Sequence, residues 1–298
     1  MRKALFVSFL AVSAVAFAGS GTLTRFSTTW NGIPRTYSVY VPQKLSDPPA
    51  LLVVLHPTST VQPPLFRAFD WEKLADQYGF VIAWPIAKYN PWVKTWHWEC
   101  DGCESGFRPL PDDSGFVRSV IVSLQSQYHV PRRRTFVVGM SSGGFMAERV
   151  GMESSDLVAA IAPVSAAQYI QPVSGRTFSP PILPNPISVY ELHGDVDAAV
   201  PYCGGTRDYW GVSSTSPSMD SDVAYWSGPS GNNCGIFSVS APLCTNGQPT
   251  TGVNGQDATG CSSSTEVIFK REVGVAHTWP AGTEAKVWAF FLSHQGTF

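Results

Sequence analysis

Charged residues are scarce in this sequence. Asp, Glu, Lys and Arg make up 14% of its 298 residues, whereas about a quarter is usual for soluble proteins. The 20 basic side chains are nearly balanced by 22 acidic ones, for a formal net charge of −2. This balance argues against a nucleic-acid-binding protein, which would carry an excess of positive charge. Hydrophobic residues (44%) and aromatic residues (12%) are plentiful, and this excludes a disordered chain.

The sequence also lacks a hydrophobic run long enough to cross a membrane. Residues 1–18 instead have the features of a secretory signal peptide, with Arg2 and Lys3, a short apolar stretch, and Ala16-Phe17-Ala18 as the cleavage site. We expect export to the periplasm or out of the cell, and no membrane attachment after signal removal. Loss of Arg2 and Lys3 leaves 18 basic and 22 acidic residues, or net −4, in a single domain over residues 19–298.

Cysteine is infrequent, and all six copies follow the signal segment: Cys100, Cys103, Cys203, Cys234, Cys244 and Cys261. An even number of cysteines in an exported chain indicates disulfides. The sequence leaves the pairing open, although Cys100 and Cys103 are close enough to pair with each other. A zinc site at Cys100 and Cys103 would need a second Cys-x-x-Cys or a His pair, which the sequence does not supply. We therefore expect no metal and no cofactor.

Hydrophobic patterning predicts strands that alternate with helices. The expected strands are 37–41, 50–55, 80–84, 135–138, 158–164 and 187–192, and the expected helices are 69–78, 112–130, 143–152 and 282–294. This alternation is typical of an α/β fold with a mostly parallel sheet and helices on both faces. Residues 213–264 depart from it, because they are rich in Ser, Gly, Asn and Thr and hold three cysteines. We expect an excursion pinned by disulfides rather than a second domain.

The strongest chemical signal is Gly139-Met140-Ser141-Ser142-Gly143. Gly-x-Ser-x-Gly alone is common, but here a buried strand precedes it and a helix follows. That context is the nucleophile elbow, which exposes a serine hydroxyl above a sheet and needs small flanking residues. Ser141 is therefore the candidate nucleophile.

A serine nucleophile needs a base and an acid that orients the base, in the chain order serine, acid, histidine. His277 fits the base, because it lies in a loop before the last expected helix. His294 lies at the end of that helix, and His193 directly follows a strand, so both are more suited to structural roles. Asp195 and Asp197 both follow the 187–192 strand, and the residue pattern leaves the choice between them open.

The motifs together resemble those of secreted α/β-hydrolase esterases, the polyhydroxybutyrate depolymerase-like and feruloyl-esterase-like family. The matching segments are Tyr37–Pro42, Leu55–Pro57, Asp112–Phe116, Gly139–Gly144, His193–Tyr202 and Gly274–Pro280. The resemblance implies an α/β-hydrolase fold and a serine carboxylic-ester hydrolase. It places the acid at the fifth position of the His193–Tyr202 loop, which is Asp197. The implied triad is Ser141, His277 and Asp197.

Backbone N–H groups should stabilise the negative oxygen of the tetrahedral intermediate. One is expected from Ser142, which follows the nucleophile, and the other from the loop after residues 50–55. The family has glycine where this sequence has Pro57, and proline has no N–H to donate. Thr58 is the matching donor, with Ser59 as the alternative.

Aromatic residues predict contacts with an ester substrate. Trp279 is the best candidate because it lies two residues after His277, and Trp98 belongs to a Trp-rich loop over residues 90–108. A polyester of the polyhydroxybutyrate type is the first expectation for the substrate. Feruloyl or acetyl esters on plant polysaccharide, or another polymer such as polyaspartate, are alternatives. A non-catalytic binding protein is disfavoured because all three triad residues are present, and the oligomeric state is left open.

Overall fold

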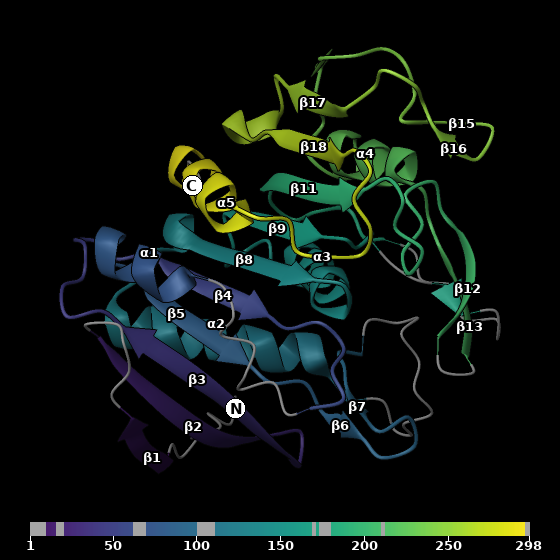
Figure 1. Cartoon of the computed structure of the whole chain (residues 1–298). Helices are drawn as coiled ribbons and strands as arrows, with labels where there is room; N and C mark the ends of the chain where they lie inside the picture. Colours follow the sequence, from purple (N-terminus) through teal and green to yellow (C-terminus); the bar gives the residue numbers. More distant parts are fainter. Residues whose placement is uncertain are drawn as a thin grey trace, which may run out of the picture.

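In the computed structural model of this chain, a mixed eleven-stranded sheet runs through the centre of the molecule (Figure 1). The structure describes residues 10–15, 21–61, 70–99, 111–168, 171–172, 180–209 and 212–295. The strand order in this sheet is β1-β2-β3-β5-β4-β8-β9-β11-β18-β17-β14. The strands are β1 (Leu10–Val15), β2 (Thr22–Trp30), β3 (Ile33–Val41), β4 (Leu51–Leu55), β5 (Val81–Pro85), β8 (Thr135–Met140), β9 (Ala160–Val164), β11 (Ser188–Gly194), β14 (Ile236–Phe237), β17 (Gly255–Thr259) and β18 (Val267–Glu272).

The middle of the sheet is parallel and its two edges are antiparallel. Neighbours from β5 through β4, β8, β9 and β11 to β18 all pair in parallel. Strands β1, β2 and β3 form the antiparallel side at one edge, and β17 and β14 form the antiparallel side at the other. Because the parallel strands point the same way, their carboxyl ends meet at one edge of the sheet, where ligands bind in open α/β sheets.

Helices cover both faces of the sheet (Figure 1). They are α1 (Trp71–Tyr78), α2 (Asp113–Tyr128), α3 (Ser142–Glu153), α4 (Met219–Ser227) and α5 (Thr283–Ser293). Smaller elements are β6 (Tyr89–Asn90) with β7 (Thr95–Trp96), β10 (Gln171–Pro172) with β12 (Gly205–Tyr209) and β13 (Val212–Ser216), β15 (Cys244–Thr245) with β16 (Gln248–Pro249), and 3-10 turns at Arg132–Arg134 and Ser262–Ser264. The expected α/β-hydrolase architecture is confirmed.

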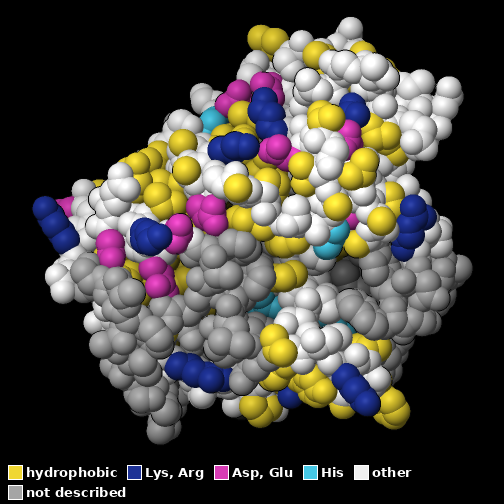
Figure 2. Space-filling view, viewed as in Figure 1, with side chains coloured by type: hydrophobic (Ala, Val, Ile, Leu, Met, Phe, Trp, Pro, Cys, Tyr) yellow, Lys and Arg dark blue, Asp and Glu magenta, His cyan; other side chains and the backbone are white. Residues whose placement is uncertain are grey.

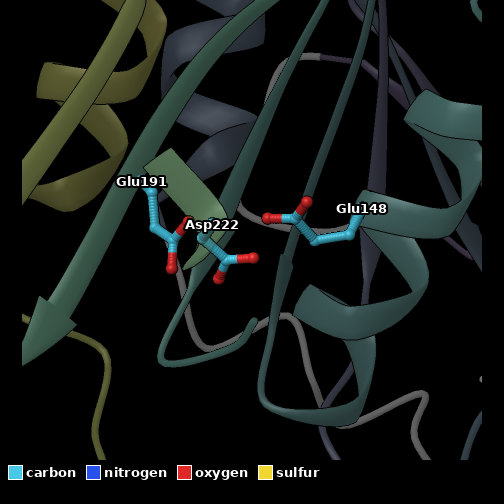
Figure 3. A group of neighbouring side chains, drawn as sticks. All are labelled: Glu148, Glu191 and Asp222. Carbon is cyan, nitrogen blue, oxygen red and sulfur yellow. The ribbon is translucent and has the colours of Figure 1, made fainter. Parts of the chain in front are cut away.

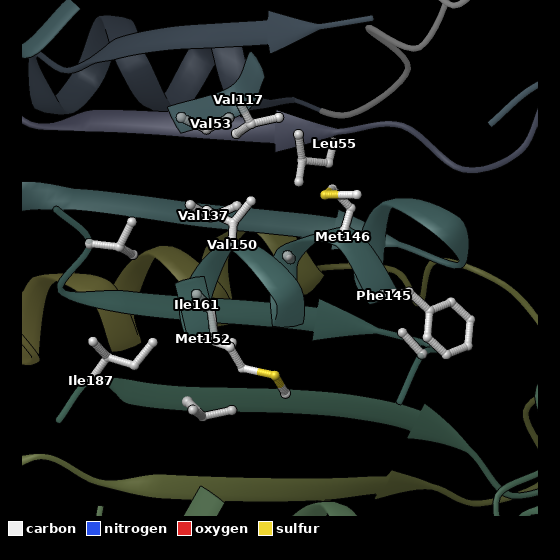
Figure 4. Packing of buried hydrophobic residues seen from close by; sticks show 14 of the residues in the cluster. Val53, Leu55, Val117, Val137, Phe145, Met146, Val150, Met152, Ile161 and Ile187 are labelled. Atoms are coloured by element: carbon white, nitrogen blue, oxygen red, sulfur yellow. The ribbon is translucent and has the colours of Figure 1, made fainter. Parts of the chain in front are cut away.

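The continuous apolar runs arise because the central strands are buried on both faces. In β4, Leu51, Val53 and Leu55 join the hydrophobic cluster that contains residues of α2 and α3, whereas Leu52 and Val54 join the one that contains residues of α1 and α5. Figure 4 shows the first cluster, with Val53 and Leu55 near side chains of α2 and α3. Alternate residues of a strand point to opposite faces, so a two-sided core requires an uninterrupted apolar strand.

Helix ends follow the expected signals. Gly79 ends α1 with a left-handed conformation (φ 71°), which glycine adopts at little cost. Asp112 caps α2 by accepting a hydrogen bond from Gly115 N (2.9 Å). The next residue, Asp113, is buried and pairs with the buried Arg35.

The expected excursion at 213–264 is more ordered than its composition indicates. It contains α4, and it adds β17 and β14 to the central sheet beside β18. Strands β2, β17 and β18 were not expected; β2 and β17 are largely polar, and β18 has only three apolar residues before Lys270. The disulfides Cys203–Cys244 and Cys234–Cys261 pin this region as expected. Cys100 and Cys103 lie outside the described residues.

Two further expectations concern the membrane and the signal segment. No helix in the described part of the chain is both long and apolar enough to span a bilayer. Strand β1 lies within residues 1–18 and pairs with β2, but β2 also pairs with β3 along all nine of its residues. The sheet from β2 onward therefore does not depend on β1, and signal removal stays a prediction.

Figure 2 shows charged side chains scattered over the displayed face without a continuous patch of one sign.

Candidate active site

Ser141 occupies the sharp turn between β8 and α3. Its backbone angles are φ 54° and ψ −124°, a region that residues with a side chain rarely adopt and that is common at functional sites. The turn is held by hydrogen bonds from Ser141 N to Val164 O (3.0 Å) and from Phe145 N to Ser141 O (3.0 Å). This is the strand–turn–helix arrangement expected of a nucleophile elbow.

Two glycines beside Ser141 allow close contacts between backbone segments, because a side chain at either position would collide with the backbone of a neighbouring segment. A Cβ at Gly139 would lie 2.1 Å from Gly143 O, and a Cβ at Gly143 would lie 2.2 Å from Leu55 O and 2.6 Å from His56 O. The first turn of α3 therefore packs directly against the end of β4. This contact places Ser142 next to the loop that carries Thr58.

His277 and Asp197 are hydrogen-bonded to each other. His277 Nδ1 lies 2.7 Å from Asp197 Oδ2, with the Asp197 carboxylate fully buried and the His277 side chain 25% exposed. Asp197 Oδ1 also accepts hydrogen bonds from Ala199 N (2.9 Å) and Val200 N (2.8 Å). Burial by itself would raise the pKa of Asp197, but hydrogen bonds from His193 and His277 and from the backbone outweigh burial and lower the pKa below its usual range. Asp197 is therefore ionised at neutral pH.

The elbow and the His277 loop are connected through the end of β9. Ser141 N bonds to Val164 O, and the next residue, Ser165, donates its hydroxyl to Thr278 O (3.3 Å). Within the described residues, no hydrogen bond joins Ser141 Oγ to His277. Serine–histidine contacts of this kind are often longer than a hydrogen bond until substrate binds.

Asp195, the other candidate acid, has a different partner. Its Oδ2 accepts from Arg271 Nε (2.9 Å) and Nη2 (2.7 Å), and its Oδ1 accepts from Gly274 N (2.6 Å). Asp195 thus fastens the loop that leads to His277 but does not contact His277. The structure places Asp197, not Asp195, beside the histidine.

The loop after β4 is held by His56, a residue of the Leu55–Pro57 motif to which the sequence assigned no role of its own. Its Nε2 accepts from Ala87 N (3.0 Å), so its Nδ1 carries the proton and donates to Pro57 O (2.7 Å). The C=O of Pro57 and the N–H of Thr58 belong to one trans peptide and point in opposite directions. His56 therefore also fixes the direction of the Thr58 N–H.

The alternative donor in this loop is already engaged. Ser59 N donates to Trp96 O (3.0 Å) and Ser59 O accepts from Trp96 N (2.7 Å). The N–H of Thr58 has no such partner within the described residues. This difference favours Thr58 over Ser59 as the second backbone donor beside Ser142.

The two tryptophans expected at the substrate lie in different environments. Trp98 is fully buried, and its indole N–H donates to His56 O (2.9 Å). This position does not fit substrate contact; Trp98 instead supports the backbone of the Thr58 loop. Trp279 is partly buried, packs edge-on against Trp71, and donates to Glu284 Oε1 (3.1 Å). Its contact with substrate stays a prediction.

The two remaining histidines of the sequence analysis have structural partners. His294 ends α5, and its Nε2 lies 2.8 Å from Glu266 Oε2. His193 is buried in β11, and its Nε2 donates to Val200 O (2.8 Å) and lies 3.5 Å from Asp197 Oδ2. His193 and His277 thus both approach Asp197 Oδ2, His277 at hydrogen-bond distance and His193 at a longer distance.

Replacement of Gly143 by alanine tests the close approach at the elbow. The new Cβ would meet the backbone of β4, which cannot swing aside like a side chain, so we expect Gly143→Ala to lower the free energy of unfolding by about 1–3 kcal/mol. Urea unfolding at pH 7 measures this. Gly235→Ala is the control, since nothing lies within 4 Å of its Cβ position. Equal stability of the two variants would contradict the proposed packing.

Titration of His56 gives a second test. Burial lowers the pKa of His56 from 6.5 to about 4, so between these values the unfolded chain binds a proton that the native state excludes. Stability therefore falls as the pH drops from 7 to 4, by roughly 3 kcal/mol for this group. Urea unfolding at several pH values should show a shallower fall for His56→Gln than for the unaltered chain. Parallel pH profiles would refute the buried, neutral histidine.

Comparisons with known proteins agree with the fold and the motifs. No family model matches the chain. It is 28% identical over 181 residues to feruloyl esterase B of Neurospora crassa, covering 58% of this chain and 60% of that protein. It is 23% identical over 205 residues to acetylxylan esterase A of Talaromyces purpureogenus, covering 68% and 45%. A bifunctional acetylxylan esterase/xylanase of Neocallimastix patriciarum is 25% identical over 173 residues, covering 57% and 22%.

The chain thus spans about a fifth to three fifths of the length of these curated relatives. Among solved structures, an acetyl xylan esterase from Aspergillus awamori matches with a TM-score of 0.55 and 18% identity, covering 86% of this chain and 94% of that one. An S-formylglutathione hydrolase from Agrobacterium tumefaciens matches with a TM-score of 0.57 and 11% identity, covering 96% and 99%. The chain has the α/β-hydrolase fold and is similar in sequence to acetylxylan and feruloyl esterases.

Proposed function

We propose that this protein is a carboxylic-ester hydrolase in which Ser141 is the nucleophile, His277 the general base and Asp197 the acid that orients it. The observation that carries the proposal is the hydrogen bond between His277 Nδ1 and the buried Asp197 carboxylate, at the same edge of the sheet as the strained turn at Ser141. Sequence similarity to curated esterases supports the same reaction class.

The reaction would proceed through an acyl-enzyme. Ser141 Oγ attacks the ester carbonyl while His277 Nε2 accepts its proton, and the N–H groups of Ser142 and Thr58 bind the negative oxygen. The intermediate collapses as His277 returns the proton to the leaving alcohol. Water, deprotonated by His277, then attacks the acyl group, and His277 returns this proton to Ser141 Oγ as the acid is released. Asp197 remains ionised throughout and stabilises the imidazolium, because its pKa is lowered.

The relatives shift the expected substrate away from a polyester. Their names refer to acetylxylan and feruloyl esters, whereas the motifs alone led us to expect a polyhydroxybutyrate-type polyester first. We therefore assign acetyl or feruloyl esters of plant polysaccharide as the substrate class. Trp279 is the side chain that we expect beside the acyl group, because it follows His277 by two residues. The two disulfides support export of the protein.

Removal of the Ser141 hydroxyl tests the mechanism. We expect Ser141→Ala to lower kcat for p-nitrophenyl acetate by at least about 10³-fold, with an unchanged unfolding midpoint, because it deletes only the nucleophile. Ser126→Ala, an exposed serine on α2, is the matched control and should keep full activity. Substantial turnover by Ser141→Ala would refute the assignment.

A substrate panel tests the finer proposal. We expect release of acetate from acetylxylan, or of ferulate from methyl ferulate, with a kcat/KM at least about tenfold above that for soluble hydroxybutyrate oligomers. Chromatography of the released acids measures both. Preference for the hydroxybutyrate oligomers would reject the polysaccharide assignment while leaving the hydrolase mechanism intact.

A further inference from the structure

Three acidic side chains converge in the interior, outside the proposed triad. Glu148 comes from α3, Glu191 from β11 and Asp222 from α4, and Figure 3 shows their carboxylates turned toward one another. All three residues are 0% exposed. One carboxylate oxygen from each lies within 4.8 Å of the others, although the three residues are far apart in the sequence.

Most of the oxygens in this cluster have no hydrogen-bond partner. Glu148 Oε1, both Glu191 Oε atoms and Asp222 Oδ2 are unpaired and buried. The remaining two oxygens accept from Trp226 Nε1 and from Gln168 N (2.8 Å). Within the described residues, no lysine or arginine pairs with any of the three carboxyls.

A fourth buried polar group faces the cluster. The His193 side chain is 1% exposed, and its Nδ1 has no hydrogen-bond partner and lies 3.7 Å from Glu191 Oε1. His193 is two residues from Glu191, so both side chains leave β11 on the same face. The cluster thus also contains a buried ring nitrogen without a hydrogen-bond partner, which belongs to a histidine and not to one of the three carboxylates.

Buried carboxylates without partners are costly, and either protons or a cation must compensate them. Burial raises the pKa of all three groups, that of Asp222 to about 7, so protons are the competing explanation. The convergence of unpaired oxygens favours a cation. Three carboxylates can supply up to about six oxygen ligands, which is within the coordination range of Ca²⁺. Hard oxygen donors select Ca²⁺, Mg²⁺ or Mn²⁺ rather than softer metals.

We propose that Glu148, Glu191 and Asp222 bind a divalent cation, with Ca²⁺ as the best match. The ion would lie between α3, β11 and α4 and would fasten the disulfide-pinned region to the central sheet. It would take no part in ester hydrolysis, and the proposal is independent of the function proposed above. His193 would lie beside the ion, between this site and Asp197.

The test uses the full chain with its disulfides intact. Because the cluster is fully buried, the protein is unfolded in guanidinium and refolded either with EDTA or with CaCl₂, and is then desalted. We expect about one Ca²⁺ per chain by mass spectrometry of the metal content. We also expect a Tm on the order of 5 °C higher after refolding with Ca²⁺ than with EDTA. Binding of Mg²⁺ or Mn²⁺ in place of Ca²⁺ would equally support a divalent-cation site.

Two variants separate the cation from protons. Asp222→Asn keeps the shape of a protonated acid but loses a charged ligand, so it should abolish both the bound Ca²⁺ and the Tm response. Glu148→Gln repeats the test from α3. Glu153→Gln, an exposed position on the same helix, is the control and should keep both.

Two results would overturn the proposal. One is an unaltered chain that binds none of the three ions, together with an Asp222→Asn variant at least as stable as that chain in EDTA. Such a result would show that protons hold the cluster together. The other is an undiminished Ca²⁺ response in both cluster variants, which would place the ion elsewhere.

Discussion

The parallel pairing of β11 with β18 is the constraint on which the candidate site depends. In this register Gly194 lies opposite Glu272, so the loops that follow the two strands begin side by side. A Cβ at Gly194 would lie 2.2 Å from Val275 O, which shows how closely the two loops pack. The ion pair of Asp195 with Arg271 holds them together. Only with the loops so aligned does His277 Nδ1 reach Asp197 Oδ2.

Two buried carboxyl groups, one in β11 and one just after it, show how hydrogen bonds and neighbouring charges set the pKa of a buried acid. Asp197 receives hydrogen bonds from His277 and two backbone N–H groups and has a lowered pKa. Glu191 has no hydrogen-bond partner for either oxygen and has a raised pKa. His193 lies between them, 3.5 Å from the first and 3.7 Å from the second. Burial raises the pKa of both groups. Hydrogen bonds and the charge of His277 outweigh burial at Asp197, whereas the nearby Asp222 raises the pKa of Glu191 further.

The structure shows where some of the few charged residues lie. Several of the few charged residues are buried rather than spread over the surface, including Arg35, Asp113 and the three acids of the interior cluster. Arg35 and Asp113 neutralise each other, whereas the cluster has no such counter-charge among the described residues. Part of the small number of charged groups is therefore buried, where each group needs a hydrogen bond, a counter-charge or a proton to compensate its burial.

The sequence by itself determined the local features. Continuous apolar strands, the caps of α1 and α2, and the small residues around Ser141 depend on neighbours only a few positions away, and they were predicted correctly. The tertiary structure decided what depends on distant partners. It placed Asp197, the acid that the resemblance implied, beside His277, and it engaged Ser59 but not Thr58 in backbone hydrogen bonds. It also buried Trp98, paired four cysteines and brought Glu148, Glu191 and Asp222 together. These contacts join residues that are tens of positions apart, and strand register and helix packing, which no local pattern encodes, bring them into contact.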